Sequence, residues 1–324
     1  MLDLYGTLGP ACASADTLEA MFRCGMTGVR LNLSHVTLRQ AAGQIDSLHT
    51  AARRCGVEPK LLIDMQGPEL RVSAMESPLP LKEGTQTLLG KGGIPVPEIV
   101  FPFLVPGQQV LLDDGKLLLE VTEQTEYGAA ARVIRGGELK GRKSIALPGC
   151  GICPPTMTEQ DRKNISAAAD YGVTGVMQPF VRNSDDLKAV RSALDKAGCK
   201  EVRLFAKIED LNGAAHLKEF FPLCDEIVIA RGDLGNAVPL WELPKLQKRI
   251  SAECRAAGKP FTVATQMLTS MEKNPVPTRA EVSDIYNAVL DGASSLIVTG
   301  ETAVGAYPVE VIRYLANTAK SALY

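Results

Sequence analysis

Hydrophobic residues along this chain gather in short, continuous runs that are rich in β-branched side chains. Each run is followed by a segment in which apolar residues return at helical spacing, and then by a glycine. Short apolar runs between helices are typical of parallel strands, because helices cover both faces of such a sheet. Eight runs fit this pattern: Leu2–Leu8, Gly28–Ser34, Lys60–Gln66, Val173–Phe180, Val202–Glu209, Glu226–Gly232, Phe261–Met267 and Ser294–Gly300.

The segments between the predicted strands carry helix start and stop signals. Thr278 and Glu281 have the spacing of a capping box, Thr158 and Asp161 are similar, and Ser184 is expected to cap a helix. Eight strand–helix units favour a closed (β/α)8 barrel, a TIM barrel of the α/β class, over an open doubly wound sheet. Glycines stand where helix C-terminal caps are expected: Gly25, Gly56, Gly172, Gly198, Gly258 and Gly292.

Residues 72–149 break the pattern, because they contain no convincing helix. The segment Val110–Val121 predicts two strands around a turn at Asp113, Asp114 and Gly115. We therefore expect a small all-β domain at 72–149, inserted after the third strand, and a barrel made of residues 1–71 and 150–324. Without the insertion 246 residues remain, close to the roughly 250 typical of a barrel. Such a domain could act as a lid.

The composition narrows the classes of partner. The formal net charge is -2 and charged residues make up 22%, evenly mixed, so no nucleic-acid or membrane-binding surface is predicted. No apolar run approaches the length of a membrane span, and residues 1–20 do not resemble a signal peptide, so a soluble, cytoplasmic protein is expected. Three histidines are too few for a histidine cage, and the close pair Cys150 and Cys153 is only a weak sign of zinc.

Candidate chemistry lies at the ends of the runs, since a barrel builds its active site at the carboxyl ends of its strands. Lys207 and Glu209 point the same way at the end of the fifth run. Gly232 and Asp233 follow the sixth run at the start of a helix, which suits an anion. Glu209 and Asp233 together would suit Mg²⁺ or Mn²⁺. The alternatives are a surface ion pair for Lys207 and Glu209, and a tight turn for the glycines.

The second, third and seventh runs add further polar groups. Arg30, Asn32 and Ser34 are expected on one face of a strand, with His35 next, and Asp64 ends the following strand. The side-chain oxygens of Asn32, Ser34 and Asp64 could hold a monovalent cation, while Arg30 could form bidentate hydrogen bonds to a phosphate. Thr265 would place a hydroxyl at the same mouth. Asn32 and Ser34 could instead be merely polar residues at a strand end.

With these motifs the chain resembles the pyruvate kinase family along nearly all of its length. An insertion stands where that family has its lid domain. The residues that carry the resemblance are Thr7–Pro10, Arg30–His35, Asp64 with Gly67–Arg71, Asp113–Gly115, Lys207–Glu209, Ala230–Gly235, Ala264–Met267, Pro277–Asp284 and Gly300–Ala303.

The resemblance implies phosphoryl transfer from phosphoenolpyruvate to ADP, giving pyruvate and ATP in glycolysis. It implies that Glu209 and Asp233 bind Mg²⁺ or Mn²⁺, and that Lys207 and Arg30 act on the phosphoryl group. The backbone at Gly232 and Asp233, together with Thr265, would hold the substrate carboxylate.

The same resemblance implies a K⁺ site and a nucleotide site. Glu69 matches the residue found in K⁺-dependent members of the family. The implied K⁺ ligands are Asn32, Ser34, Asp64 and the carbonyl of Met65, and the implied nucleotide contacts are Pro10, His35, Arg71 and Lys143.

Several positions depart from the family pattern. Met65 and Gln66 replace a threonine and a lysine, Pro179 replaces a serine, and Ala146 replaces an asparagine. The chain ends at Tyr324, so the resemblance implies that the family's C-terminal effector domain is absent. We expect these departures to affect ADP use more than phosphoenolpyruvate binding. A homodimer through the barrel and an unregulated or weakened enzyme are the expectations.

Two other functions stay open from sequence. A catalytically weak or silent homologue would bind phosphoenolpyruvate or a related oxyacid with Mg²⁺. A Mg²⁺-dependent enolate lyase or aldolase would use the same carboxylates, but it would not need Arg30, the polar cluster around Asp64 or a lid.

Overall fold

The computed structural model describes residues 2–34, 36–113, 115–150 and 152–323. The chain forms two compact units, which are Met1–Gly67 together with Thr156–Tyr324, and Pro68–Pro155. The chain thus passes between the units a few residues away from the predicted boundaries at 71 and 150.

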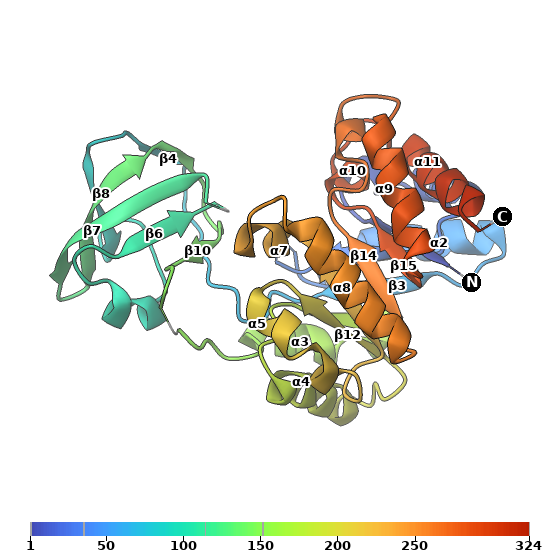
Figure 1. The fold of residues 1–324 in the computed structure, drawn as a ribbon, viewed down its shortest axis with the longest axis horizontal. Helices are drawn as coiled ribbons and strands as arrows, with labels where there is room; N and C mark the ends of the chain where they lie inside the picture. The colour runs from blue at the N-terminus through green and yellow to red at the C-terminus, as the bar shows by residue number, and fades with distance from the viewer. Residues whose placement is uncertain (1, 35, 114, 151, 324) are drawn as a thin grey trace. The chain divides into compact units, whose positions relative to one another are not determined.

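The larger unit is a closed barrel of eight parallel strands, which confirms the predicted fold class (Figure 1). Each strand pairs with the strands on either side, and Asn32 lies beside Asp64 in the register of the second and third strands. The barrel strands are β1 (Asp3–Thr7), β2 (Gly28–Asn32), β3 (Lys60–Asp64), β11 (Gly175–Gln178), β12 (Arg203–Ile208), β13 (Glu226–Ala230), β14 (Phe261–Ala264) and β15 (Ser295–Ile297).

Helices follow the strands and form the outer layer of this unit. Helices α9 and α11 lie side by side near the end of the chain (Figure 1). The helices are α1 (Ala15–Arg23), α2 (Ala42–Cys55), α3 (Glu159–Ser166), α4 (Ser184–Lys196), α5 (Leu211–Ala215), α6 (Leu217–Phe220), α7 (Arg231–Ala237), α8 (Leu243–Ala256), α9 (Arg279–Leu290), α10 (Gly300–Ala303) and α11 (Pro308–Ser321). Short 3-10 helices are η1 (Pro10–Cys12), η3 (Ala169–Tyr171) and η4 (Thr269–Glu272).

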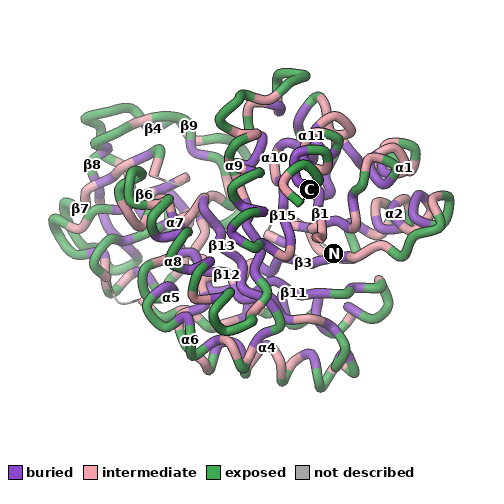
Figure 2. The backbone as a smooth tube through the Cα atoms, turned by 45° about the vertical axis from the view of Figure 1, so that its right-hand side comes forward, coloured by how far each residue is buried: buried purple, intermediate pink, exposed green. Residues whose placement is uncertain are grey.

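Alternation along the strands divides the core into an inner and an outer layer, because successive side chains point to opposite faces. One set of buried residues fills the barrel interior: Tyr5, Leu62, Met177, Phe205, Val228, Ala264 and Ile297. Their neighbours along the strands, such as Leu204 and Val263, join the larger core beneath the helices. Figure 2 shows the barrel strands buried and the helices alternating between buried and exposed positions.

The helix ends agree with most of the predicted signals. Thr158 and Thr278 both form complete capping boxes. The prediction for Ser184 was wrong by one residue: Asn183 is the cap, and its side chain accepts hydrogen bonds from the amides of Asp185 and Asp186. All six predicted cap glycines have positive φ, a conformation that costs glycine no clash with a Cβ atom.

The smaller unit is built mainly of antiparallel strands. The predicted strand–turn–strand is confirmed as β6 and β7, while Asp114 of its turn lies outside the described residues. A short 3-10 helix, η2 (Glu98–Phe103), was not predicted. The strands are β4 (Leu79–Leu81), β5 (Gln86–Gly90), β6 (Gln109–Leu112), β7 (Leu117–Thr125), β8 (Gly128–Arg135), β9 (Gly137–Leu139) and β10 (Ile145–Ala146), with β10-β6-β7-β8-β5 in one sheet and β4-β9 in another.

The helices of the described residues fall short of a membrane crossing in length or in hydropathy. Across the described ranges, none meets the length and hydropathy that a membrane crossing requires.

Candidate active site

One buried carboxylate joins three strands at the carboxyl end of the barrel. Asp64 is the last residue of β3 and accepts hydrogen bonds from Arg30 of β2, with Nη2 at 2.6 Å and Nε at 2.8 Å from Oδ2. Lys207 of β12 places its Nζ atom 3.2 Å from both oxygens of Asp64 and 2.8 Å from Oε1 of Glu209. The Lys207 and Arg30 side chains are each 13% exposed, so this is a semi-enclosed charged cluster and not a surface ion pair.

Burial and neighbouring charge set the protonation of this cluster. Burial opposes a charge on Asp64, but Lys207 and Arg30 outweigh it and hold the pKa of this carboxyl below its ordinary value. Burial also disfavours the Lys207 ammonium, yet Asp64 and Glu209 raise the pKa of Lys207 above its ordinary value. Both groups are therefore charged at neutral pH.

Glu209 behaves differently from Asp64. Burial, together with the charges of Asp233 and Asp64, raises the pKa of Glu209 to about 7 against the opposing effect of Lys207. Its Oε2 accepts a hydrogen bond of 2.7 Å from the backbone amide of Phe180, which has a φ of 47°. Asp233, the other carboxylate predicted to bind the metal, thus lies near enough for its charge to act on Glu209.

The two carboxylates fit a hard divalent cation. A cation between Glu209 and Asp233 would offset both their mutual repulsion and the cost of burying Glu209. In the described part of the chain, no cluster of three or more His, Cys, Asp or Glu side chains could hold a metal. Substrate and water oxygens would therefore have to complete the shell, as Mg²⁺ sites usually allow.

Thr265 lies on a strained turn directly after β14. Thr265 and Gln266 have φ values of 69° and 53°, which non-glycine residues rarely adopt. The guanidinium of Arg231 stabilises the turn by donating to the Thr265 carbonyl at 2.6 Å and to the Gln266 carbonyl at 3.2 Å, and it pairs with Asp284 at 2.6 Å. Sequence reasoning did not assign this supporting role to Arg231.

The turn brings Thr265 to Gly232, two residues that the family resemblance implies in binding the substrate carboxylate. The Gly232 amide donates to Oγ1 of Thr265 at 2.8 Å, and this hydroxyl donates to the Ala264 carbonyl at 2.6 Å. A bound carboxylate at this amide would have to replace the Thr265 hydroxyl as its acceptor.

The predicted K⁺ ligands lie at the ends of β2 and β3. Asn32 pairs in register with Asp64, and its Oδ1 accepts from the Ser34 amide at 3.1 Å. Strand β2 ends at Asn32, so Ser34 lies in the following turn and not on the predicted strand face. The Met65 side chain is 1% exposed and belongs to the outer core, so this position could offer a cation its carbonyl. Asp64 is already bound to Arg30 and Lys207, which lowers its availability to a further cation.

The predicted nucleotide contacts are divided between the two units. Pro10 begins η1 directly after β1, and His35 lies outside the described residues. In the smaller unit, Arg71 pairs with Glu69 at 2.6 Å, and Lys143 Nζ lies 2.8 Å from Oδ1 of Asp113. These residues are described within their own unit, and their part in a nucleotide site stays a prediction.

Thr7 is a site residue that the chemistry of strand ends did not single out. Its Oγ1 donates to the Val298 carbonyl at 2.8 Å and accepts from Arg30 Nη1 at 3.3 Å. The Thr302 hydroxyl in turn accepts from the Thr7 amide at 2.8 Å. The motif Thr7–Pro10 marks this residue in the sequence. Its partners Val298 and Thr302 lie near the far end of the chain, so their contacts with Thr7 could not be predicted.

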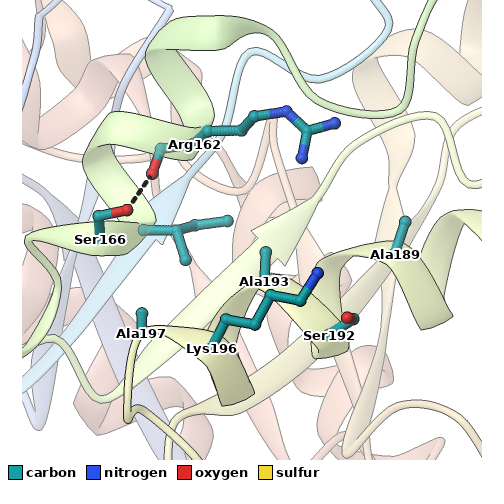
Figure 3. A pocket seen from close by; sticks show the side chains of 8 residues that line it. Arg162, Ser166, Ala189, Ser192, Ala193, Lys196 and Ala197 are labelled. Carbon is teal, nitrogen blue, oxygen red and sulfur yellow. Dashed lines mark hydrogen bonds between the residues drawn. The ribbon is translucent and has the colours of Figure 1, made fainter.

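Among the described residues, two pockets lie away from the carboxyl ends of the strands. One of about 240 Å³ lies between α3 and α4, where Figure 3 shows Arg162 and Ser166 opposite Lys196. Another of about 870 Å³ lies at the amino ends of the strands, where Lys60 and Arg203 already pair with Asp3 and Glu226. Neither pocket gathers the groups described above.

Comparison with known proteins shows similarity to pyruvate kinases. The family model for the pyruvate kinase barrel domain matches residues 2–312. Pyruvate kinase of Geobacillus stearothermophilus is 36% identical over 324 residues, which cover 97% of this chain and 55% of that protein. Pyruvate kinase of Aeropyrum pernix is 37% identical over 322 residues, which cover 98% of this chain and 70% of that protein. The chain thus spans little more than half the length of the Geobacillus relative.

Proposed function

Because the chain belongs to the pyruvate kinase family, we propose that it transfers the phosphoryl group of phosphoenolpyruvate to ADP in the cytoplasm, giving pyruvate and ATP. The observation that carries the proposal is the cluster of Arg30, Asp64, Lys207 and Glu209. Two cations held by one carboxylate are suited to a phosphoryl group, because such transfer depends on positioning and on neutralising oxygen charge.

Each residue of this site has its own proposed role. Arg30 would form bidentate hydrogen bonds to the phosphoryl oxygens. Lys207 would neutralise the charge on the transferred group and on the enolate that is left behind. Thr265, with the backbone at Gly232 and Asp233, would orient the substrate carboxylate. A Mg²⁺ ion held by Glu209 and Asp233 would offset negative charge on the phosphoryl group.

The proposal extends to a monovalent cation and to the nucleotide. Asn32, Ser34, Asp64 and the Met65 carbonyl would hold K⁺ beside the phosphoryl position. The proposed ADP contacts are Pro10, His35, Arg71 and Lys143. The smaller unit, residues 68–155, would serve as a lid that excludes water during transfer.

A coupled pyruvate assay tests the proposal. The protein is supplied with phosphoenolpyruvate, ADP and Mg²⁺, with and without K⁺, and is compared with a Lys207→Met variant. Pyruvate formation that depends on Mg²⁺ and rises with K⁺ is expected. A rate no higher than that of the variant would reject the proposal.

The second candidate is a silent homologue that binds phosphoenolpyruvate or a related oxyacid. It is favoured by three changes from the family pattern: Met65 and Gln66 directly follow Asp64, and Pro179 precedes Phe180, whose amide donates to Glu209. Calorimetry separates the two, since oxalate binding with Mg²⁺ but without ADP binding supports the silent homologue. Measurable ADP affinity supports the kinase.

We also propose a homodimer formed through the barrel. Leu240 and Trp241 precede α8 and are 69% and 80% exposed, an unusual exposure for two adjacent large apolar side chains. Burial of this pair against a second copy of the chain would remove apolar surface from water.

A further inference from the structure

Buried carboxylates hold the chain at both points where it passes between the two units. Gly67 is the last barrel residue before the insertion, and Thr156 is the first after it. Gly67 donates its amide to Asp161, and Thr156 donates its hydroxyl to Asp186. Asp161 and Asp186 are 1% and 3% exposed and lie in the first turns of α3 and α4.

Asp161 does more than cap its own helix. Capping uses the amide and the hydroxyl of Thr158, at 2.9 and 2.8 Å from Oδ2. The same carboxylate accepts the Gln66 amide at 3.0 Å through Oδ1 and the Gly67 amide at 3.0 Å through Oδ2. These two donors lie more than ninety positions away along the chain, directly after the strand that ends at Asp64.

Asp186 holds the returning segment in a similar way. Its Oδ1 accepts the Thr156 hydroxyl at 2.5 Å and Nη2 of Arg182 at 2.8 Å. Its Oδ2 accepts the backbone amide and Nε of Arg182, both at 3.0 Å. The carboxylate is therefore fixed by Arg182, and Thr156 is bound to a rigid partner.

The end of β11 lies between the two held residues. Gln178 is fully buried and donates through Nε2 to the Thr156 carbonyl at 3.4 Å and to the Pro179 carbonyl at 3.0 Å. On the other side, a Cβ atom added to Gly67 would approach Cγ of Pro179 to 2.5 Å, and Gly67 has a φ of 61°. Pro179, a departure from the family pattern, is thus packed closely against the outgoing segment.

We propose that Asp161 and Asp186 are positioning residues that fix the barrel end of each passage, and that Asp161 thereby holds the Asp64–Met65 strand end in the site. The second part rests on the proposed function. The two peptide groups between Asp64 and Gln66 are planar, so a displaced Gln66 amide moves the Met65 carbonyl. An error of about 1 Å in a site can cost about a hundredfold in rate.

Hydrogen–deuterium exchange tests the positioning without an activity assay. Oδ2 of Asp161 accepts from the Gly67 amide and from the amide and hydroxyl of Thr158, whereas Oδ1 accepts from the Gln66 amide. In Asp161→Asn, one oxygen remains and can keep the three donors at Oδ2. The new NH₂ group then faces the Gln66 amide, which loses its acceptor. We expect peptides that cover residues 62–68 to exchange at least about tenfold faster. Glu159→Gln, an exposed carboxylate on the same helix, is the matched control and should leave exchange unchanged.

The returning segment has its own pair of variants. Asp186→Asn should speed exchange over residues 152–158, while exposed Asp185→Asn should not. Thr156→Val removes the donor and leaves the carboxylate in place, so it reports the same contact even if Asp186→Asn fails to fold. Unchanged exchange in Asp161→Asn or in Thr156→Val would overturn the proposed positioning of that passage.

The link to the site is read from K⁺ activation in the pyruvate assay. Asp161→Asn should raise the K⁺ concentration for half-maximal activation at least threefold and lower kcat, whereas Glu159→Gln should match the parent chain. Faster exchange with an unchanged K⁺ response and kcat would overturn the link to Asp64 and Met65. A parent chain that forms no pyruvate would instead reject the proposed function, while the exchange result would still decide the positioning.

Discussion

The ammonium of Lys207 lies 3.2 Å from both carboxylate oxygens of Asp64, at the carboxyl ends of two strands that are not neighbours in the barrel. Asp64 also binds Arg30, so one buried carboxylate orients two cations. In the proposed phosphoryl transfer, such preorganisation would favour transition-state stabilisation, because the cations would not have to reorganise during the reaction.

Replacement of Lys207 tests the catalytic role of this pair. Lys207→Met should lower kcat by about 10²–10³-fold, because a charge aimed at the transferred group is lost. It also removes the positive charge that lowers the pKa of Glu209, so this pKa should rise further above about 7. Steady-state pyruvate formation measures the first effect. Lys218→Met, an exposed lysine on α6, serves as the control, and an equal loss there would contradict a specific role.

Proton competition at Glu209 predicts how Mg²⁺ affinity depends on pH. The metal requires the carboxylate form, and a pKa of about 7 means that most of Glu209 is protonated at pH 6. Apparent Mg²⁺ affinity should therefore fall as the pH decreases, by about tenfold between pH 8 and pH 6. Calorimetric titration at both pH values measures this. Glu209→Gln should bind more weakly and lose the pH dependence, and equal affinities for the parent chain would count against the prediction.

A polar network at the opposite end of the barrel should affect stability and not catalysis. Glu226 is 2% exposed and binds Arg203 at 2.7 Å, Thr262 at 2.6 Å and Ser295 at 2.8 Å. Glu226→Ala leaves these groups without their acceptor and should lower the free energy of unfolding by about 3 kcal/mol, measured by urea denaturation.

Kinetics provide the second readout for this network. The KM for phosphoenolpyruvate should not change in Glu226→Ala, because the active sites of such barrels lie at the carboxyl ends of the strands. Glu219→Ala, an exposed glutamate, is the control and should change neither quantity. A raised KM in Glu226→Ala at full folding would show that the amino-terminal end takes part in the site.

The single tryptophan reports directly on self-association. Trp241 is the only tryptophan in the chain and is 80% exposed. If a homodimer buries it, its fluorescence emission should shift to shorter wavelength as the protein concentration rises through the dissociation constant. Trp241→Glu should sediment as a monomer. A dimer in sedimentation velocity whose emission stays that of an exposed tryptophan would place the interface elsewhere.

Local physics made much of the architecture readable from sequence. Eight apolar runs separated by amphipathic segments can bury both faces of a strand only in a parallel, helix-covered sheet, and the structure closes that sheet into a barrel. The capping boxes at Thr158 and Thr278 and the six cap glycines follow from bonds and sterics within a few residues. Asn183, and not Ser184, caps α4, and its side-chain oxygen accepts hydrogen bonds from the amides of both Asp185 and Asp186.

The position of several candidate site residues at carboxyl ends of strands was also readable, since the parallel barrel brings the carboxyl end of every strand to one mouth. Tertiary packing alone decided how they interact. No spacing in the sequence shows that Asp64 binds both Arg30 and Lys207, that burial and Asp233 raise the pKa of Glu209, or that Arg231 stabilises two residues with positive φ. These properties depend on distances and desolvation between segments far apart in the chain, whereas strands, helices and caps depend on neighbours that the sequence itself places side by side.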